Sequence, residues 1–460
     1  MNIPPDVWQS CLEVLQQISE DPSMVNEEER FKSLIAKIHR QGKKGERRIT
    51  RQDRIAEDRE LKSATGMAQK QQRLSAPHAL PASGASLPVR LQRPNPCYIC
   101  KTPYTELHFF YHLLCPACAE LNYRMRFLRT DLTGRVALIT GGRIKIGYET
   151  ALRLLRDGAH VIVTTRFAND AQKRFQAQED FAVWQERLQI MTLDLRDLPS
   201  VESFARYLLQ TETALDILIH NAAQTIRRPP EYYRALLSEE NSQQALLPDA
   251  ASDLEGPHSE QTDLQESRTH NPNTLTSLSK YFPANAFDAD GQPLDLRPVN
   301  SWKLKLDQVG AVEMVEVQLI NAIAPFLLNG RLKPLLLRSR FPRRFIINVS
   351  AMEGQFQREF KTVFHPHTNM AKAALNMMTR TSAADYAREG IFMNSVDTGW
   401  ITDENPYPTR IHLQETRRFY APLDAVDGMA RIYAPIVQGI EDPAEPPYGH
   451  FLKDYTPCPW

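Results

Sequence analysis

The segment VALITGGRIKIG, from Val136 to Gly147, constrains the fold of this chain more than any other feature. It begins as an apolar run typical of a buried β-strand and then turns through glycines into a helix. Without a Cβ at Gly141, Gly142 and Gly147 the turn can be tight, and the helix can lie close to the sheet. This geometry points backbone N–H groups and a helix N-terminus at an anion. The segment therefore predicts a site for the pyrophosphate of a dinucleotide.

Length and charge predict a multi-part protein with no obvious partner class. At 460 residues the chain exceeds the usual size of one hydrophobic core. Its 55 basic and 55 acidic residues cancel, so bulk charge favours neither nucleic acid nor membrane. The N-terminus, MNIPPDVWQS, matches neither a secretory signal nor a transit peptide, and no apolar run approaches the ~20 residues of a membrane span. We therefore expect a cytoplasmic protein.

Residues 1–70 predict a charged helical arm. Apolar residues recur at three- and four-residue steps over residues 5–20, and residues 37–54 carry eight basic side chains against two acidic ones. The basic stretch is interpreted either as a solvated helix or as a surface for a protein or nucleic-acid partner. The absence of interleaved aromatic residues disfavours nucleic acid. Residues 71–95 are rich in Ser, Ala and Pro and predict a linker.

Residues 96–125 contain two CxxC pairs separated by fourteen residues. Each pair can aim two thiolates at one point, and four thiolates satisfy a closed, tetrahedral zinc site that has no open position for chemistry. A redox role for the pairs is the disfavoured alternative. His108 and His112 lie between the pairs and are expected to pack, although either could replace a ligand. The predicted zinc ligands are Cys97, Cys100, Cys115 and Cys118.

Residues 130–455 alternate apolar strands with amphipathic helices. This order predicts a Rossmann-like α/β fold, a doubly wound parallel sheet with helices on both faces and ligands at the carboxyl ends of the strands. Residues 229–299 break the pattern because they are polar and too long for an ordinary connection, and they predict a surface insertion that could act as a lid. The predicted strands are Val136–Ile139, His160–Thr164, Arg187–Thr192, Ile217–His220, Arg344–Val349 and Ile391–Val396.

Several motifs of residues 133–455, in the order in which they occur along the chain, resemble those of the short-chain dehydrogenase/reductase family. The family's Thr-Gly-x-x-x-Gly-x-Gly motif is similar to Thr140–Gly147, with Lys145 in place of the middle glycine and Ile146 before the last. The resemblance implies further cofactor contacts near the adenine, at the Asn-Asn-Ala-Gly turn and beside the nicotinamide. The residues matching these positions are Asp194, Asn221, Ala222, Gly399 and Thr402.

The resemblance also implies an active site. Asn321, Ser350 and Lys372 match the family's Asn, Ser and Lys. The family places its proton donor, a Tyr, four residues before the Lys, and this chain has Thr368 there. The pKa of an aliphatic hydroxyl is too high for Thr368 to take over the role of a phenol.

Two hypotheses follow for the proton. In the first, a histidine of the HPHTN segment, His367 rather than His365, relays the proton, since histidine titrates near neutral pH. Ser350 then holds the substrate oxygen and Lys372 the nicotinamide ribose. In the second, the site binds the cofactor without turnover, and the zinc element and basic arm recruit a protein or nucleic-acid partner.

Charge favours NADP over NAD. No acid follows the strand HVIVTT to bind the ribose hydroxyls, and Arg166 stands there instead. Arg143 lies in the glycine turn, and guanidinium groups match the oxygens of a 2′-phosphate. Lys145 either crowds the pyrophosphate or, as we expect, swings outward and pairs with a phosphate. The sequence thus predicts an NADP-dependent oxidoreductase of a small carbonyl or alcohol, and the resemblance adds the possibility of a homo-oligomer.

Overall fold

The computed structural model describes residues 3–26, 28–75, 89–244, 279–284, 286–288, 290–357, 361–444 and 446–460. Its centre is an eight-stranded sheet in the order β10-β9-β8-β7-β6-β3-β4-β5, parallel except for the β9–β10 pair. The strands are β3 (Val136–Thr140), β4 (His160–Thr165), β5 (Leu188–Thr192), β6 (Ile217–His220), β7 (Arg344–Ser350), β8 (Ile391–Asp397), β9 (Phe451–Lys453) and β10 (Thr456–Cys458). The doubly wound α/β prediction is confirmed, and all six predicted strands are present.

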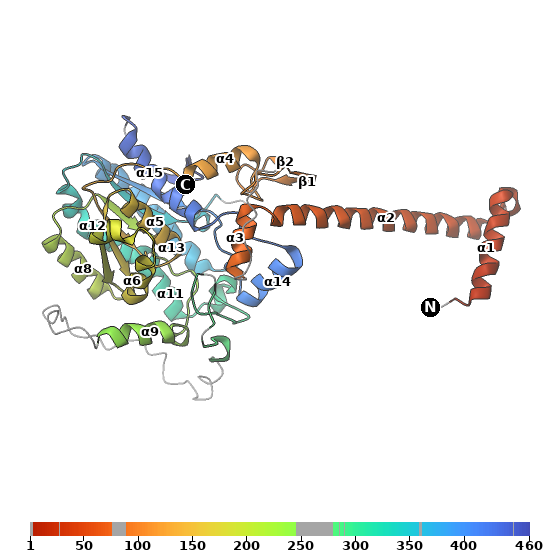
Figure 1. The fold of residues 1–460 in the computed structure, drawn as a ribbon, viewed down its shortest axis with the longest axis horizontal. Coiled ribbons are helices and arrows are strands. Elements are labelled where there is room, and N and C mark those ends of the chain that lie inside the picture. Colours follow the sequence, from red (N-terminus) through yellow and green to blue (C-terminus); the bar gives the residue numbers. More distant parts are fainter. Residues whose placement is uncertain are drawn as a thin grey trace.

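Helices cover both faces of this sheet (Figure 1). Alternate side chains of β3 explain the two layers, because Ala137 and Ile139 join one buried cluster and Leu138 joins the other. The first cluster includes side chains of α5 (Lys145–Arg156) and α15 (Ala425–Glu441). The second includes side chains of α8 (Leu198–Thr211), α12 (Ala324–Leu337) and α13 (Pro366–Ala387). Smaller helices complete the body, namely α6 (Ala168–Gln176), α7 (Phe181–Trp184), α11 (Ala311–Gln318) and α14 (Tyr407–Arg417).

One helix among the described residues is long and apolar enough to cross a membrane, although the sequence predicts no apolar run of that length. It is the continuous helix Ala311–Leu337, formed by α11, a π-helical turn (Leu319–Ile323) and α12. Leu328, Leu332 and Leu335 of this helix are fully buried in the second of the two buried clusters. One face of this helix therefore packs in the core of the body.

The N-terminal part forms an arm and a small docked element. Helices α1 (Pro5–Glu20) and α2 (Glu29–Ser63) extend away from the body, as Figure 1 shows, and agree with the predicted helical arm. Helix α3 (Gly66–Ser75), strands β1 (Arg90–Pro96) and β2 (Pro103–Glu106), and helix α4 (Pro116–Met125) follow. The predicted linker is thus shorter than residues 71–95, since α3 and β1 take its two ends. Its middle, residues 76–88, lies outside the described residues.

The predicted insertion begins with a helix packed against the body. Helix α9 (Pro230–Gln244) contacts α6, and Phe287 pairs with Pro293 in a β-bridge. Residues 245–278, 285 and 289 of the insertion lie outside the described residues. The described part of the insertion therefore lies at the carboxyl ends of the strands, beside the glycine turn.

Candidate active site and metal site

The glycine turn has the close packing that its sequence predicts. Gly141 has a φ of +70°, and a Cβ there would lie 2.8 Å from Cα of Ala222. A Cβ on Gly147 would overlap the carbonyl oxygen of Gly141. Asn221 Nδ2 donates to that carbonyl at 2.9 Å, and Ala222 N donates to the Thr140 hydroxyl at 3.1 Å. These contacts hold the start of α5 against β3 and leave its first N–H groups at the carboxyl edge of the sheet.

Lys145 takes the backbone conformation for which the family keeps a glycine. Its φ is +54°, a left-handed value that costs a residue with a Cβ about 1 kcal/mol. Its ammonium lies 3.6 Å from Asp290 Oδ2 in the insertion. The side chain thus points outward, as expected, and its partner in this structure is a carboxylate.

The two arginines predicted near the adenosine differ in their partners. Arg143 is buried, forms an ion pair with Asp170 and donates to Gln292 Oε1 at 2.6 Å. Arg166, which follows β4, lies over the ring of Tyr233 at 4.7 Å. A guanidinium on an aromatic face keeps its N–H donors free to bind an anion. Arg166 is therefore the better candidate for a 2′-phosphate.

A carboxylate from α9 caps the neighbouring helix. The N-cap residue of α6 is Phe167, which has no side-chain oxygen to offer. Glu240 supplies one instead, accepting from Asn169 N at 2.9 Å and, more weakly, from Asp170 N at 3.4 Å. The insertion thus places a negative charge at the N-terminus of α6, directly after Arg166.

The catalytic corner lies at the carboxyl ends of β7 and β8. Ser350, at the end of β7, donates its hydroxyl hydrogen to Asn376 Oδ1 at 2.6 Å. Lys372 Nζ donates to the Val349 carbonyl at 2.8 Å. Thr368 Oγ1 and Asn376 Nδ2 are buried without a hydrogen-bond partner among the described residues. Unpaired buried polar atoms are costly, so they mark a place where a ligand could bind.

Burial shifts the pKa values of two titratable groups at this corner. It lowers the pKa of the Lys372 ammonium to about 8, and Glu353 opposes the shift. Burial likewise raises the pKa of Asp397, the residue paired with Ser350 in the sheet register, to about 6. Perturbed titratable groups at a strand edge are typical of functional sites.

Both candidate histidines are buried. His367 Nε2 lies 3.3 Å from Glu313 Oε1 on α11, without hydrogen-bond geometry. His365 has a φ of +43° and stacks on Trp302, with ring centroids 3.8 Å apart. The hydroxyl of Ser350 is engaged by Asn376, so the relay from His367 stays a prediction.

The remaining predicted residues lie around the same edge. Asn321 is buried in the π-helical turn, where its amide accepts from Gln224 N at 2.7 Å. Asp194 is paired with Arg196. Gly399 has a φ of +80°, and the hydroxyl of Thr402 donates to Glu404 at 2.5 Å. Lys145, Thr402 and the insertion line one small cavity of about 40 Å³.

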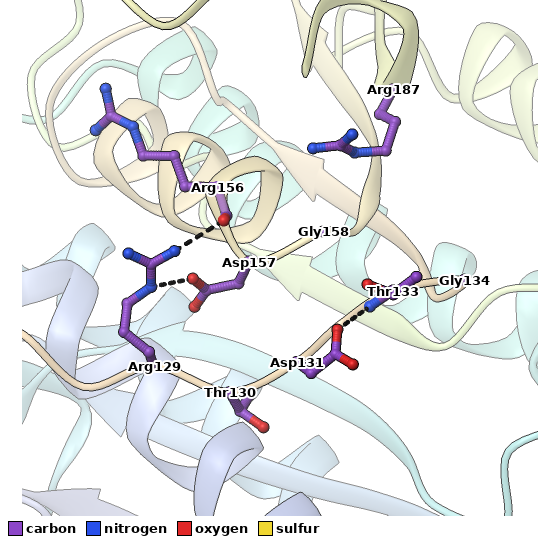
Figure 2. Close-up of a pocket in the computed structure, with 9 residues that line it drawn as sticks. All are labelled: Arg129, Thr130, Asp131, Thr133, Gly134, Arg156, Asp157, Gly158 and Arg187. Atoms are coloured by element: carbon purple, nitrogen blue, oxygen red, sulfur yellow. Dashed lines mark hydrogen bonds and ion pairs between the residues drawn. The ribbon is translucent and has the colours of Figure 1, made fainter. Parts of the chain in front are cut away.

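A wider hollow of about 750 Å³ lies at the opposite edge of the sheet (Figure 2). Its walls come from the segments before β3 and β4, where Arg129 is paired with Asp157. Ligands of open α/β sheets bind at the carboxyl ends of the strands. This hollow is therefore no candidate for the cofactor.

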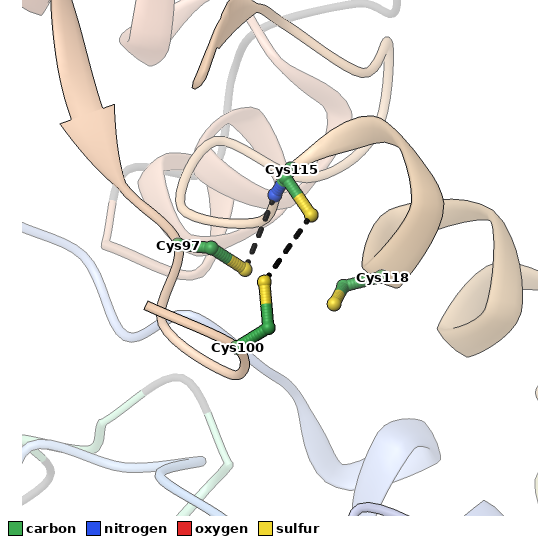
Figure 3. Close-up of side chains that lie close together, drawn as sticks. All are labelled: Cys97, Cys100, Cys115 and Cys118. Atoms are coloured by element: carbon green, nitrogen blue, oxygen red, sulfur yellow. Dashed lines mark hydrogen bonds between the residues drawn. The ribbon is translucent and has the colours of Figure 1, made fainter. Parts of the chain in front are cut away.

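The four predicted cysteines converge in one cluster (Figure 3). Their sulfurs all lie within 4.8 Å of one another, and Cys100 Sγ lies 3.7 Å from Cys115 Sγ. Zn–S bonds of about 2.3 Å put tetrahedral sulfurs about 3.8 Å apart, so the cluster fits zinc. Burial, with the neighbouring sulfurs, raises the pKa of the Cys118 thiol, a shift that a bound cation would reverse.

The histidines between the cysteine pairs do not join the cluster. His108 Nδ1 accepts from the Phe110 and Tyr111 backbone, and His112 Nε2 lies 3.3 Å from the Tyr420 carbonyl. The expectation that both pack is confirmed.

Comparison with known proteins shows what parts of the chain resemble. The sequence model described as short chain dehydrogenase matches residues 135–241. The uncharacterised protein R665 of Acanthamoeba polyphaga mimivirus is 31% identical over 355 residues, which cover 74% of this chain and 71% of the viral protein. Human dehydrogenase/reductase SDR family member 13 is 41% identical over 134 residues, 28% of this chain and 32% of that protein. Residues 135–241 are therefore similar to short-chain dehydrogenases, and the viral relative that spans most of the chain carries no family name.

A solved structure gives a weaker likeness. Carbonyl reductase Sniffer of D. melanogaster is 19% identical, with a TM-score of 0.44 over 71% of this chain and 100% of that one. The long arm, the four-cysteine element and residues 242–299 of the insertion lie outside the stretch that the family model matches.

Sequence reasoning missed several residues of the site. Asn376 follows Lys372 by one helical turn on α13, so the i, i+4 spacing could have revealed it. Glu313 and Gln224 come from distant segments and carry no local signal. Tyr98, inside the first CxxC pair, accepts from Trp400 N at 2.9 Å, a contact over 302 positions that no sequence pattern indicates.

Proposed function

We propose that this protein is an NADP-dependent oxidoreductase that acts on a carbonyl or alcohol, with zinc as a structural metal. The observation that carries the proposal is the convergence of Ser350, Lys372 and the glycine turn at one edge of the sheet, with Thr368 Oγ1 and Asn376 Nδ2 left unpaired. The glycine cradle and these unpaired atoms fit a dinucleotide cofactor, which supplies or accepts a hydride when bound.

The residues of the corner then divide the work. The Lys372 ammonium binds the ribose hydroxyls, since it is a buried cation of α13 at this corner. The Ser350 hydroxyl holds the substrate oxygen: its hydrogen, which goes to Asn376 Oδ1 in this structure, turns to a carbonyl substrate, and its oxygen accepts from an alcohol. Thr368 cannot ionise, so the proton must come from another group. His367, buried beside Glu313, is the proposed donor.

The preference for NADP rests on Arg166. Its guanidinium lies over an aromatic ring, while Arg143 is already paired with Asp170. A guanidinium without an ion pair among the described residues, at the end of β4, suits a 2′-phosphate.

The test is titration with both cofactors, followed by turnover. Calorimetry should show NADP binding more tightly than NAD, and NADPH should be consumed with at least one member of a broad carbonyl panel. His367→Gln should abolish turnover and keep NADP affinity, whereas His365→Gln serves as the matched variant. Failure of the wild-type protein to bind either cofactor would overturn the proposal.

The zinc assignment is tested by metal analysis of the purified protein. One zinc per chain is expected, with loss of the metal in Cys97→Ser. A metal-free protein in which the four cysteines react fully with a thiol reagent would contradict it. A reducing compartment suits such thiolates, and the cytoplasmic location stays a prediction.

A second candidate function is a cofactor-bound scaffold. Its supporting observation is the exposed arm, on which the eight basic residues of 37–54 all fall within an arc of about 140° on one face of α2. Such a stripe suits an acidic protein partner or a nucleic-acid backbone. Tight NADP binding without turnover, combined with turnover gained by Thr368→Tyr, would favour this candidate over the enzyme.

A further inference from the structure

The zinc element contacts one stretch of the dehydrogenase domain, residues 398–431. Tyr98 contacts this stretch at Trp400, His112 at the Tyr420 carbonyl, and Tyr111 at Asp427, where its hydroxyl donates to Oδ1 at 2.5 Å. The stretch begins with Gly399–Thr402, the loop that the family resemblance places beside the nicotinamide.

The backbone around the first cysteine pair fixes the position of Tyr98. It lies between Cys97 and Cys100, and its backbone N–H donates to the Leu113 carbonyl at 2.8 Å. Its hydroxyl oxygen accepts from Trp400 N at 2.9 Å. The position of this hydroxyl therefore depends on the geometry of the first cysteine pair.

The loop itself is packed between the two parts. A Cβ on Gly399 would lie 2.6 Å from Leu423 Cδ1. Leu423 is fully buried in the small cluster that contains Cys97 and Cys115. Farther along the loop, Trp400 Nε1 donates to the Thr402 carbonyl at 2.9 Å. A shift at Tyr98 thus reaches Thr402 through two hydrogen bonds.

Buried ion pairs anchor the rest of the stretch. Arg126, directly after α4, donates to both carboxylate oxygens of Asp424 at 2.7 and 3.0 Å and lies 2.9 Å from Asp427 Oδ1. Lys70 of α3 adds a contact to Asp424 at 2.6 Å. Asp424 and Asp427 also cap the N-terminus of α15. Such charge-assisted contacts give the docked element one fixed orientation.

We propose that the zinc element positions the Gly399–Thr402 loop for the nicotinamide half of the cofactor, with Tyr98 as the positioning residue. The inference rests on the proposed function, because it requires that the loop meets the cofactor. Zinc occupancy then sets the affinity for the nicotinamide half and leaves the adenosine half unchanged, since Arg166 packs on Tyr233 of α9.

The test compares two probes on the full chain. NADPH reaches the loop, whereas 2′-phospho-ADP-ribose has the same adenosine half and no nicotinamide. Tyr98→Phe should weaken NADPH binding about 3- to 10-fold, the range for loss of one neutral hydrogen bond, with zinc content and 2′-phospho-ADP-ribose binding unchanged. Tyr104→Phe is the matched control, since that hydroxyl donates to His112 O within the zinc element.

A second measurement covers the case in which Tyr98→Phe does not fold. Wild-type protein treated with a zinc chelator should lose NADPH affinity, keep 2′-phospho-ADP-ribose affinity and change its tryptophan fluorescence. An equal loss of affinity for both probes, or no loss of affinity for either, would overturn the inference. Wild-type protein that binds 2′-phospho-ADP-ribose and NADPH equally would also overturn it, whereas binding of neither probe would overturn the proposed function instead.

Discussion

The two ends of the proposed cofactor site differ in how their polar groups are satisfied. At the adenosine end the charges are paired within the chain, Lys145 with Asp290 and Arg143 with Asp170, and Glu240 caps α6. At the nicotinamide end, buried polar atoms of Thr368 and Asn376 lack partners among the described residues, and at the adenosine end Gln292 Nε2 also lacks one.

This difference shows which end a ligand would change most. A cofactor entering the adenosine end must compete with carboxylates that the insertion already places there. At the nicotinamide end it would supply hydrogen bonds that the protein cannot make itself, and each such group is costly when left unpaired. The first end can therefore set selectivity, and the second can supply affinity and chemistry.

Lys372→Met should have the largest effect on this comparison. The variant removes the buried ammonium, and charge-assisted hydrogen bonds are worth enough to weaken NADPH binding about 10- to 100-fold. Calorimetry with NADPH and with adenosine 2′,5′-bisphosphate, which lacks the nicotinamide ribose, measures the loss, which should be confined to NADPH. Lys333→Met, which removes a surface lysine of α12 paired with Glu389, is the control. Unchanged NADPH affinity would show that the nicotinamide end contributes little.

Arg166→Gln should have the next largest effect. Loss of the guanidinium should weaken NADP about 10-fold and leave NAD unchanged, since only NADP has the 2′-phosphate. Arg143→Gln should shift the NADP to NAD ratio much less, because Arg143 is held by Asp170. The opposite ranking in competitive titrations would mean that Arg143 leaves its partner when the cofactor binds.

Glu240→Gln should produce a smaller change of opposite sign. It removes a negative charge from the N-terminus of α6, so NADP should bind about 2- to 5-fold more tightly. NAD affinity provides the internal reference because NAD has no 2′-phosphate. Weaker NADP binding in the variant would show that the Glu240 cap supports the site instead of competing with the phosphate.

The smallest expected effect is a pH dependence of NADPH affinity. Burial lowers the pKa of Lys372 to about 8, so the ammonium is fully present at pH 6 and half lost at pH 8. NADPH should bind about twofold more weakly at pH 8 than at pH 6, because only the protonated lysine donates to the ribose. Lys372→Met should remove this dependence. If the pH dependence of NADPH affinity persists in that variant, another titratable group causes it.

The fold was predictable because its signals are local. Each of the six main strands is an apolar run, and their alternation with helices identifies a parallel sheet. The strands β9 and β10 have three residues each, too few for a periodic signal. The cysteine cluster was predictable for a different reason, since the ligand set of zinc is encoded in the CxxC spacing.

The site was predictable only in part. Resemblance located Ser350 and Lys372, but the partners that orient them depend on tertiary contacts. Glu240 reaches α6 from about 70 positions away along the chain, and Tyr98 reaches Trp400 from 302. The positive φ of Lys145 was hidden because a lysine gives no indication of a left-handed backbone.

The ion pairs of Arg126 have a practical consequence for anyone who trims this chain to its recognisable catalytic part. A fragment beginning at residue 130 would lack Arg126 and Tyr111, and its fully buried Asp427 would lose both partners of Oδ1. Leu423 would become exposed along with the start of α15. Expression of that fragment should yield aggregated or unstable material, so the N-terminal element belongs in any version intended for crystals or assays.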